Sequence, residues 1–302
     1  MKFVLFGDWG MITRPMIDFF AFIAPMYEYF ILLGDNFYPK GVESFSSEEW
    51  KLLDLFPVHS KIYPVLGNHD YEKNPYNQIL YTRNMNKKRN WHMPFFYYDK
   101  KWTISETQTI HFLFLDTQLI DPEYTISFFS DKDENAKNMR KMSQQFYEKQ
   151  LQWLDTTISS CQCRWKIVCG HYPVFSSGLH SKSGKTAKVI LSLIKKYKID
   201  IYFSGHDHNS EVFEYCIPET GHKCLFVVSG GIAEKRPSRG TIHDNGDSVF
   251  SPLLSPRVII TKIFTSPVEG VFELSLPNAH ELQLSFLCTQ DKATTFYYQK
   301  NK

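Results

Sequence analysis

Polar side chains that could bind metal ions follow a series of apolar runs in this sequence. The stretch Gly34-Asp35-Asn36-Phe37-Tyr38 comes directly after the apolar run 29–33 and places a carboxylate and a phenol three residues apart. A carboxylate can bridge two cations, and a phenolate oxygen is a hard ligand suited to a trivalent metal. The same order of strand-like run, Gly and polar side chain recurs four more times. The candidate ligands are Asp8, Asp35, Tyr38, Asn68, His171, His206 and His208.

Each of these motifs also has an alternative interpretation as ordinary turn chemistry. Gly7-Asp8-Trp9-Gly10 is a common kind of turn, and Asn68-His69 can be one as well. His206-x-His208 is stronger, because alternate residues at a strand end project to the same side. In open α/β sheets, ligands bind at the carboxyl ends of strands, so side chains that follow several strands should meet there. Seven ligands suffice for two metals that share one carboxylate, and we favour this interpretation.

The elements that must position these side chains alternate between strands and helices. This alternation is typical of βαβ units and predicts an α/β fold with two βαβ halves. Strands are predicted at 2–7, 29–33, 62–66, 102–105, 110–115, 165–169 and 201–203, and helices at 15–24, 47–56, 143–158 and 186–197. A hairpin at 211–228 and strands at 258–264, 270–275, 281–287 and 295–299 complete the fold. Long loops are predicted at 71–100, 118–141 and 230–256.

Length and composition predict one large domain covering residues 1–302. The chain is 43% hydrophobic and can bury a large core. Its 34 basic and 32 acidic residues give a net charge of +2, so no global field attracts nucleic acid or a membrane surface. Charged residues and Pro25 interrupt the apolar segment 17–33, which argues against a membrane span.

The first apolar run predicts a strand rather than a signal peptide. Gly7 and Asp8 end this run before a hydrophobic region of signal-peptide length has formed. The sequence also contains no Asn-x-Ser/Thr glycosylation acceptor. We therefore expect a cytoplasmic protein, with a secreted or vacuolar one as the alternative if a leader once preceded this sequence.

The six cysteines are too few for a disulfide scaffold in a chain of this length. Cys216 and Cys224 flank the predicted hairpin and could form a disulfide with each other. Free thiols are the alternative, and we favour them.

Together, the five motifs resemble those of the metallophosphoesterases, and specifically the small, tartrate-resistant (mammalian) type of purple acid phosphatase. Tyr38 distinguishes this subfamily from the Ser/Thr protein phosphatases, which have a different Asp motif. The resemblance implies a four-layer αββα sandwich of two mixed β-sheets flanked by helices. The motifs are Gly7-Asp8-Trp9-Gly10, Gly34-Asp35-Asn36-Phe37-Tyr38, Gly67-Asn68-His69-Asp70, Gly170-His171-Tyr172-Pro173 and Gly205-His206-Asp207-His208-Asn209.

The resemblance also implies a role for each residue of the site. Fe(III) would be bound by Asp8, Tyr38 and His208, and Asp35 would bridge it to a second metal. The second metal, Fe(II), Zn or Mn, would be bound by Asn68, His171 and His206. His69 and His180 match the family's catalytic histidines, which face the substrate without binding metal. Residues 118–140 match the loop that restrains activity in this subfamily.

The predicted function is that of a binuclear metal-dependent acid phosphatase. By resemblance, a metal-bound hydroxide would attack a phosphate monoester, which could be a small molecule or a phosphopeptide. Histidines become cationic toward acidic pH and can then protonate a leaving alkoxide, so we expect an acidic pH optimum. We also expect the enzyme to be a monomer. The alternatives are a catalytically silent scaffold with the same fold, or a phosphodiesterase or phosphoprotein phosphatase on the same site.

Overall fold

Two mixed β-sheets of seven strands each form the centre of the molecule. The computed structural model describes residues 1–84, 90–180, 184–217, 219–232, 259–288 and 294–299. The first sheet joins the beginning and the end of the chain, and its strands β1 to β4 are parallel to one another. Its order is β14 (Thr294–Gln299), β13 (Glu281–Cys288), β12 (Gly270–Asn278), β1 (Lys2–Phe6), β2 (Tyr29–Leu33), β3 (Lys61–Val65) and β4 (Asn90–Trp91).

The second sheet comes from the middle of the chain and has the same mixed character. Strands β6, β7, β8 and β10 are parallel, and β5, β9 and β11 pair antiparallel at its two sides. Its order is β11 (Ile259–Thr265), β9 (Ser210–Cys216), β10 (Lys223–Ser229), β8 (Ile201–Ser204), β7 (Trp165–Cys169), β6 (Gln108–Phe114) and β5 (Tyr98–Ser105).

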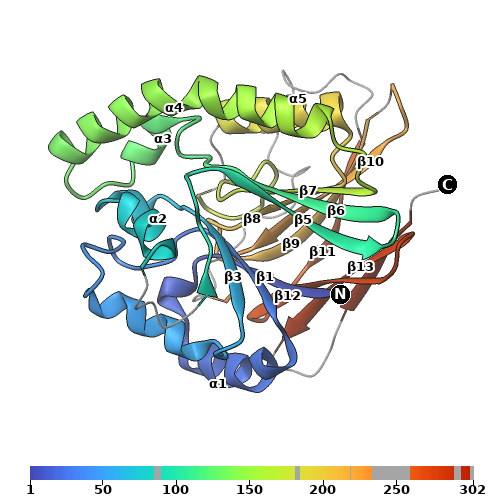
Figure 1. Ribbon diagram of the computed structural model, residues 1–302, viewed down its shortest axis with the longest axis horizontal. Coiled ribbons are helices and arrows are strands. Elements are labelled where there is room, and N and C mark those ends of the chain that lie inside the picture. The colour runs from blue at the N-terminus through green and yellow to red at the C-terminus, as the bar shows by residue number, and fades with distance from the viewer. Residues whose placement is uncertain (85–89, 181–183, 218, 233–258, 289–293, 300–302) are drawn as a thin grey trace.

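Helices cover the outer faces of the two sheets. Figure 1 shows α4 and α5 lying along the second sheet, with α1 on the far side of the first. The α-helices are α1 (Arg14–Ile23), α2 (Tyr76–Thr82), α3 (Pro122–Ile126), α4 (Asp133–Ser159) and α5 (Gly184–Tyr197). The 3₁₀ helices are η1 (Trp9–Met11), η2 (Ala24–Met26), η3 (Glu48–Leu55) and η4 (His69–Tyr71). The predicted αββα arrangement is confirmed.

Aromatic side chains fill the space between the sheets. Phe3 of β1 is fully buried, and its ring centroid lies 5.0 Å from that of Trp102 and 4.9 Å from that of Phe112 in the second sheet. Burying one such side chain contributes about 1.5–3 kcal/mol. Because these contacts hold the two sheets face to face, they also fix the relative positions of the loops at the strand ends.

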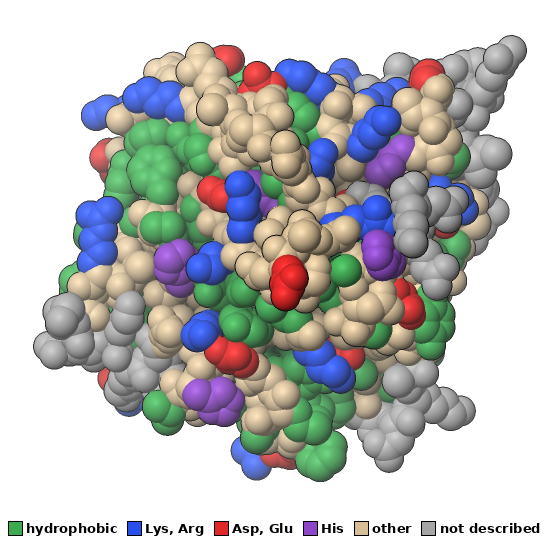
Figure 2. All heavy atoms as spheres, turned by 45° about the vertical axis from the view of Figure 1, so that its right-hand side comes forward, with side chains coloured by type: hydrophobic (Ala, Val, Ile, Leu, Met, Phe, Trp, Pro, Cys, Tyr) green, Lys and Arg blue, Asp and Glu red, His purple; other side chains and the backbone are tan. Residues whose placement is uncertain are grey.

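The charged surface is mixed in sign. Figure 2 shows acidic side chains interspersed with lysine and arginine over the described part of one face, in keeping with the net charge of +2. No helix in the described ranges combines the length and apolar character that a membrane span requires.

The prediction of an irregular loop over 118–141 is wrong for most of its length. The structure has α3 there, followed by α4, which begins ten residues before the predicted helix at Ser143. The side chains that α4 buries follow helical spacing from its first turns: Ala136, Met139, Ser143, Phe146, Gln150, Leu154 and Ile158. The charged residues between them concealed this pattern.

Three other local predictions differ from the structure or lie outside it. The helix expected at 47–56 is the 3₁₀ helix η3, whose buried Trp50 and Leu53 lie three residues apart, the period of a 3₁₀ helix. The loop expected at 71–100 contains α2, where Tyr81 stacks on Trp50 with ring centroids 3.7 Å apart. The loop expected at 230–256 falls mainly outside the described residues.

The cysteines of the hairpin are free thiols, as favoured from the sequence. Cys216 pairs in register with Lys223, and Cys224 with Tyr215. Neighbouring positions on a strand point to opposite faces, so the two sulfurs lie on opposite sides of the sheet. A disulfide instead joins Cys161 to Cys163, which the sequence analysis did not predict.

Candidate metal centre

The predicted ligands lie where the parallel strands of both sheets end. Asp8, Asp35 and Asn68 follow β1, β2 and β3, whereas His171 and His206 follow β7 and β8. Since the sheets pack face to face, these carboxyl ends converge on one region. All five side chains are buried, with at most 4% of the residue surface exposed.

Three of the predicted ligands have a backbone conformation that residues other than glycine rarely adopt. The φ angles of Asp8, Asp35 and His206 are 61°, 52° and 71°, in the left-handed region. Such conformations cost on the order of 1 kcal/mol or more and occur preferentially at functional sites. In the described residues only Lys198 among other non-glycine residues shares this feature, which marks these turns as specialised.

One group of predicted ligands surrounds the phenol of Tyr38. The Tyr38 hydroxyl lies 2.8 Å from Asp35 Oδ2, 3.4 Å from Asp8 Oδ1 and 3.5 Å from His208 Nε2. His208 Nε2 is also 3.8 Å from Asp8 Oδ1. A phenol, two carboxylates and an imidazole thus meet at one point, which is the ligand set that the resemblance assigned to Fe(III).

A second group surrounds His171. Its Nε2 atom lies 3.1 Å from Asn68 Oδ1 and 3.5 Å from Asp35 Oδ1. The ring of His206 lies beside that of His171, with centroids 5.1 Å apart. These are the residues that the resemblance assigned to the divalent metal.

Asp35 belongs to both groups because its two oxygens face different ways. Oδ2 contacts Tyr38 of the first group, and Oδ1 contacts His171 of the second. The carboxylate is therefore placed to bridge two cations. Asp8, Asp35 and His171 alone also form a cluster whose potential ligand atoms lie within 4.8 Å of one another.

Backbone contacts orient the ligands from behind. Leu33 O lies 2.8 Å from His171 Nδ1, so Nδ1 carries the proton that it donates and Nε2 presents its lone pair to the site. Burial lowers the pKa of His171, although the nearby Asp35 carboxylate opposes this effect. Asp8 Oδ2 accepts from the backbone N–H of His206 at 2.8 Å, which leaves Oδ1 facing the first group.

Asp70 organises the turns that carry two of the ligands. Its carboxylate accepts hydrogen bonds from the backbone N–H groups of Asn36 and Gly67 and from the side chain of Gln78. Burial, followed by the neighbouring Asp35 carboxylate, raises the pKa of Asp70 to about 7. Through these contacts Asp70 orients the turns that carry Asp35 and Asn68.

The two predicted catalytic histidines line a small cavity over the ligands. Asp35, Tyr38, Asn68, His206 and His208 line its floor, and His69, His180 and Phe128 complete a volume of about 70 Å³. His69 Nδ1 donates to Pro39 O at 2.6 Å, and its Nε2 lies 4.0 Å from Asp35 Oδ2. His180 is anchored through its backbone N–H, which donates to Asp207 Oδ1 at 3.0 Å. All nine predicted site residues thus meet in one region.

Two aromatic residues at the site were missed from the sequence. The Tyr124 hydroxyl lies 3.2 Å from His206 Nε2 and donates to His180 O at 2.8 Å. Phe128 packs edge-on against both histidines, at centroid distances of 5.1 and 5.7 Å. Asp121-Pro122-Glu123 at the start of α3 was the available signal, since an Asp N-cap, an early Pro and an acid favour a helix start.

The chemistry of these side chains fits a pair of metal ions. Their donors are carboxylate, phenol and amide oxygens together with imidazole nitrogens, which suit iron, zinc and manganese. The backbone contacts of His171 and Asp8 leave one ligand atom of each facing inward. The two oxygens of the buried Asp35 carboxylate face separate groups of donor atoms. A single metal ion would not require this arrangement.

Comparison with known proteins agrees with this geometry. The family model for calcineurin-like phosphoesterases matches residues 1–210. Human tartrate-resistant acid phosphatase type 5 is 27% identical over 308 residues, which cover 92% of this chain and 91% of the relative. This family is metal-dependent, and its members act on phosphate esters.

Two solved structures have a similar fold. GAP50, described as the anchor in the inner membrane complex of Plasmodium, matches with a TM-score of 0.70 at 22% identity, over 100% of this chain and 88% of that one. A purple acid phosphatase from yellow lupin seeds matches with a TM-score of 0.60 at 13% identity, over 99% and 53%. By its sequence match over more than half its length, the chain belongs to the calcineurin-like phosphoesterase family, and its relatives include the purple acid phosphatases.

Proposed function

We propose that this protein is a two-metal acid phosphatase that hydrolyses phosphate monoesters. The observation that carries the proposal is the position of Asp35, whose two oxygens face two separate sets of ligand atoms. We assign Asp8, Tyr38 and His208 to Fe(III), and Asn68, His171 and His206 to Fe(II), Zn or Mn. When bound, two such ions would supply the Lewis acidity that activates water and offsets phosphate charge.

The chain itself would bind the substrate and move a proton. His69 and His180 line the cavity beside the ligands Tyr38 and His206, with ring centroids 4.3 and 5.4 Å apart, where their imidazoles can face a phosphate group. A cationic imidazole there would neutralise a phosphate oxygen and could protonate the leaving alkoxide. The apolar ring of Phe128, which also lines the cavity and packs against His180 and His206, would limit access of water. These roles predict activity that falls as the pH rises.

The first experiment is a visible absorption spectrum with metal analysis of the oxidised protein, followed by an activity panel. A broad band in the purple region, with about two metals per chain including iron, would support a Tyr38 phenolate bound to ferric ion. Hydrolysis of an aryl phosphate monoester, in preference to a diester or phosphopeptides, would support the monoesterase. Preference for a diester or a phosphopeptide would assign the same site to a different phosphoesterase reaction.

A second candidate function is that of an anchoring scaffold. The observation that favours it is the TM-score of 0.70 to a Plasmodium protein described as an anchor. The intact set of predicted ligands favours the enzyme, because a silent relative has no need to keep them. A chain that stays metal-free after reconstitution with iron and zinc, and inactive toward all three substrates, would favour the scaffold. A monomeric state and a cytoplasmic location are further proposals for this protein, supported by its sequence alone.

A further inference from the structure

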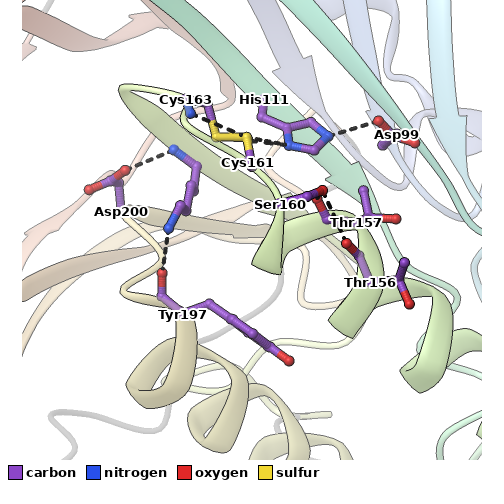
Figure 3. Close-up of a disulfide and its surroundings, with 10 residues drawn as sticks. Asp99, His111, Thr156, Thr157, Ser160, Cys161, Cys163, Tyr197 and Asp200 are labelled. Carbon is purple, nitrogen blue, oxygen red and sulfur yellow. Dashed lines mark hydrogen bonds and ion pairs between the residues drawn. A yellow bond between two sulfur atoms is a disulfide. The ribbon is translucent and has the colours of Figure 1, made fainter.

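Two cysteines and a histidine meet at the opposite end of the second sheet from the candidate metal centre. Cys161 and Cys163 lie between α4 and β7, and His111 lies on β6 (Figure 3). His111 Nδ1 is 3.2 Å from Cys161 Sγ and 3.9 Å from Cys163 Sγ. His171 comes eight positions after Cys163, so strand β7 keeps this cluster roughly 20 Å from the other site.

The protonation state of His111 directs a lone pair at the sulfurs. Its Nε2 atom lies 2.8 Å from Asp99 Oδ2, a carboxylate oxygen that can only accept, so Nε2 carries the proton. The His111 side chain is fully buried. In the neutral ring, Nδ1 is then unprotonated, and Figure 3 shows it facing the disulfide.

The disulfide does not satisfy this nitrogen. Sulfur atoms in a disulfide carry no hydrogen, so neither Cys161 nor Cys163 can donate to Nδ1. Among the described residues, Nδ1 makes its two polar contacts with these sulfurs. A buried acceptor without a donor costs roughly 1–3 kcal/mol. A metal ion bound to the same three atoms would remove this cost.

The distances from His111 Nδ1 to the two sulfurs are close to those in a metal site. Zinc binds Cys sulfur at roughly 2.3 Å and His nitrogen at roughly 2.0–2.1 Å, so tetrahedral ligands lie roughly 3.4–3.8 Å apart. The distances of 3.2 and 3.9 Å from Nδ1 to the two sulfurs are close to this range. The potential ligand atoms of His111, Cys161 and Cys163 all lie within 4.8 Å of one another. The sulfurs themselves would separate once their bond is broken.

We propose that, after reduction of the Cys161–Cys163 disulfide, Cys161, Cys163 and His111 bind one zinc ion, with a fourth position left for water. A phosphine or thiol reductant supplies two electrons and is itself oxidised, the S–S bond breaks, and each sulfur takes up one proton. Zinc binding then releases those two protons, because thiolates are the ligands. Two thiolates balance the charge of the ion, and soft sulfur ligands select zinc over the iron and manganese expected at the other site.

Asp99 is the positioning residue of this proposed site. A carboxylate that accepts from the second nitrogen of a ligating histidine fixes the ring and strengthens it as a ligand.

The test is a cobalt(II) and zinc titration of the full-length chain, before and after reduction with a phosphine that is then removed under nitrogen. Thiolate-to-cobalt absorption in the near ultraviolet reports sulfur ligands, which the candidate metal centre does not contain. The expected result is about one extra ion per reduced chain, with this absorption, displaced by zinc. The double variant C161S/C163S keeps the other four cysteines and is expected to lose both.

A second variant tests whether Asp99 positions His111, separately from any effect on folding of the chain. Asp99→Asn is expected to weaken cobalt binding by roughly 10–100-fold while the absorption at saturation persists. Absence of thiolate-to-cobalt absorption in the reduced chain would overturn the proposal. So would equal absorption in C161S/C163S, or a disulfide that the phosphine leaves intact in the folded protein. Because the readout is specific to sulfur, failure of the two-metal phosphatase proposal would not change the result.

Discussion

Replacing Gly67 with alanine should detach Asp35 from its position between the two ligand groups. A Cβ atom at Gly67 would lie 2.2 Å from both Asp35 N and Asp35 Oδ1, and 2.8 Å from its Cγ. Real Cβ atoms essentially never approach other heavy atoms closer than 3.0 Å, so Asp35 and the turn at Gly67 must move apart by at least about 0.8 Å. Metal–ligand distances tolerate only about 0.2 Å.

The expected result of Gly67→Ala is loss of metal and of activity in a chain that still folds. A misplacement of about 1 Å costs roughly 100-fold in turnover. Overpacking costs about 1–3 kcal/mol, which is smaller than the usual stability of about 5–15 kcal/mol. The assay combines metal analysis, turnover of an aryl phosphate and thermal unfolding of the same preparation.

Gly184→Ala is the matched control for this prediction. Gly184 is the first residue of α5, and its added Cβ would have no neighbour within 4 Å. Alanine is the better helix former, so stability should rise by up to about 1 kcal/mol with metal content unchanged. The reasoning is refuted if folded Gly67→Ala retains two metals per chain and most of its activity.

Three further predictions concern single side chains. His180→Ala should lower turnover by roughly 100-fold or more without loss of metal, and metal loss in that variant would show that His180 is a ligand. Tyr38→Phe should abolish the purple absorption band, and a band that persisted would assign the colour to another ligand. Burial raises the pKa of Asp116 from its usual 3.8 to about 7, so the folded state keeps a proton that the unfolded chain releases. Asp116 therefore makes the protein lose stability, on the order of 4 kcal/mol, as the pH rises from about 4 to about 7. Asp116→Asn should flatten this pH dependence in urea unfolding, whereas equal slopes in both chains would contradict it.

Much of the fold could be predicted from the sequence because the signals involved are local. Buried parallel strands such as β2 read as uninterrupted apolar runs, and each ends at a Gly followed by a polar residue. Parallel strands of one βαβ half have their carboxyl ends at the same edge of a sheet, so Asp35 and Asn68 could be expected to lie close together. The structure of residues 118–141 was predicted wrongly because charged residues on the solvent-exposed face of α4 obscure the helical spacing of its buried residues.

Other properties depend on contacts between distant parts of the chain, which local sequence patterns do not reveal. Tyr124 reaches His206, 82 residues further along, because α3 folds over the strand ends. His111 lies on β6, and the pairing of β6 with β7 brings it to cysteines about 50 residues away. Residue types and local spacing were enough to show which side chains could do chemistry, because both can be read directly from the sequence. Which of those atoms face one another, and which side chains cover them, depended on how the two sheets pack.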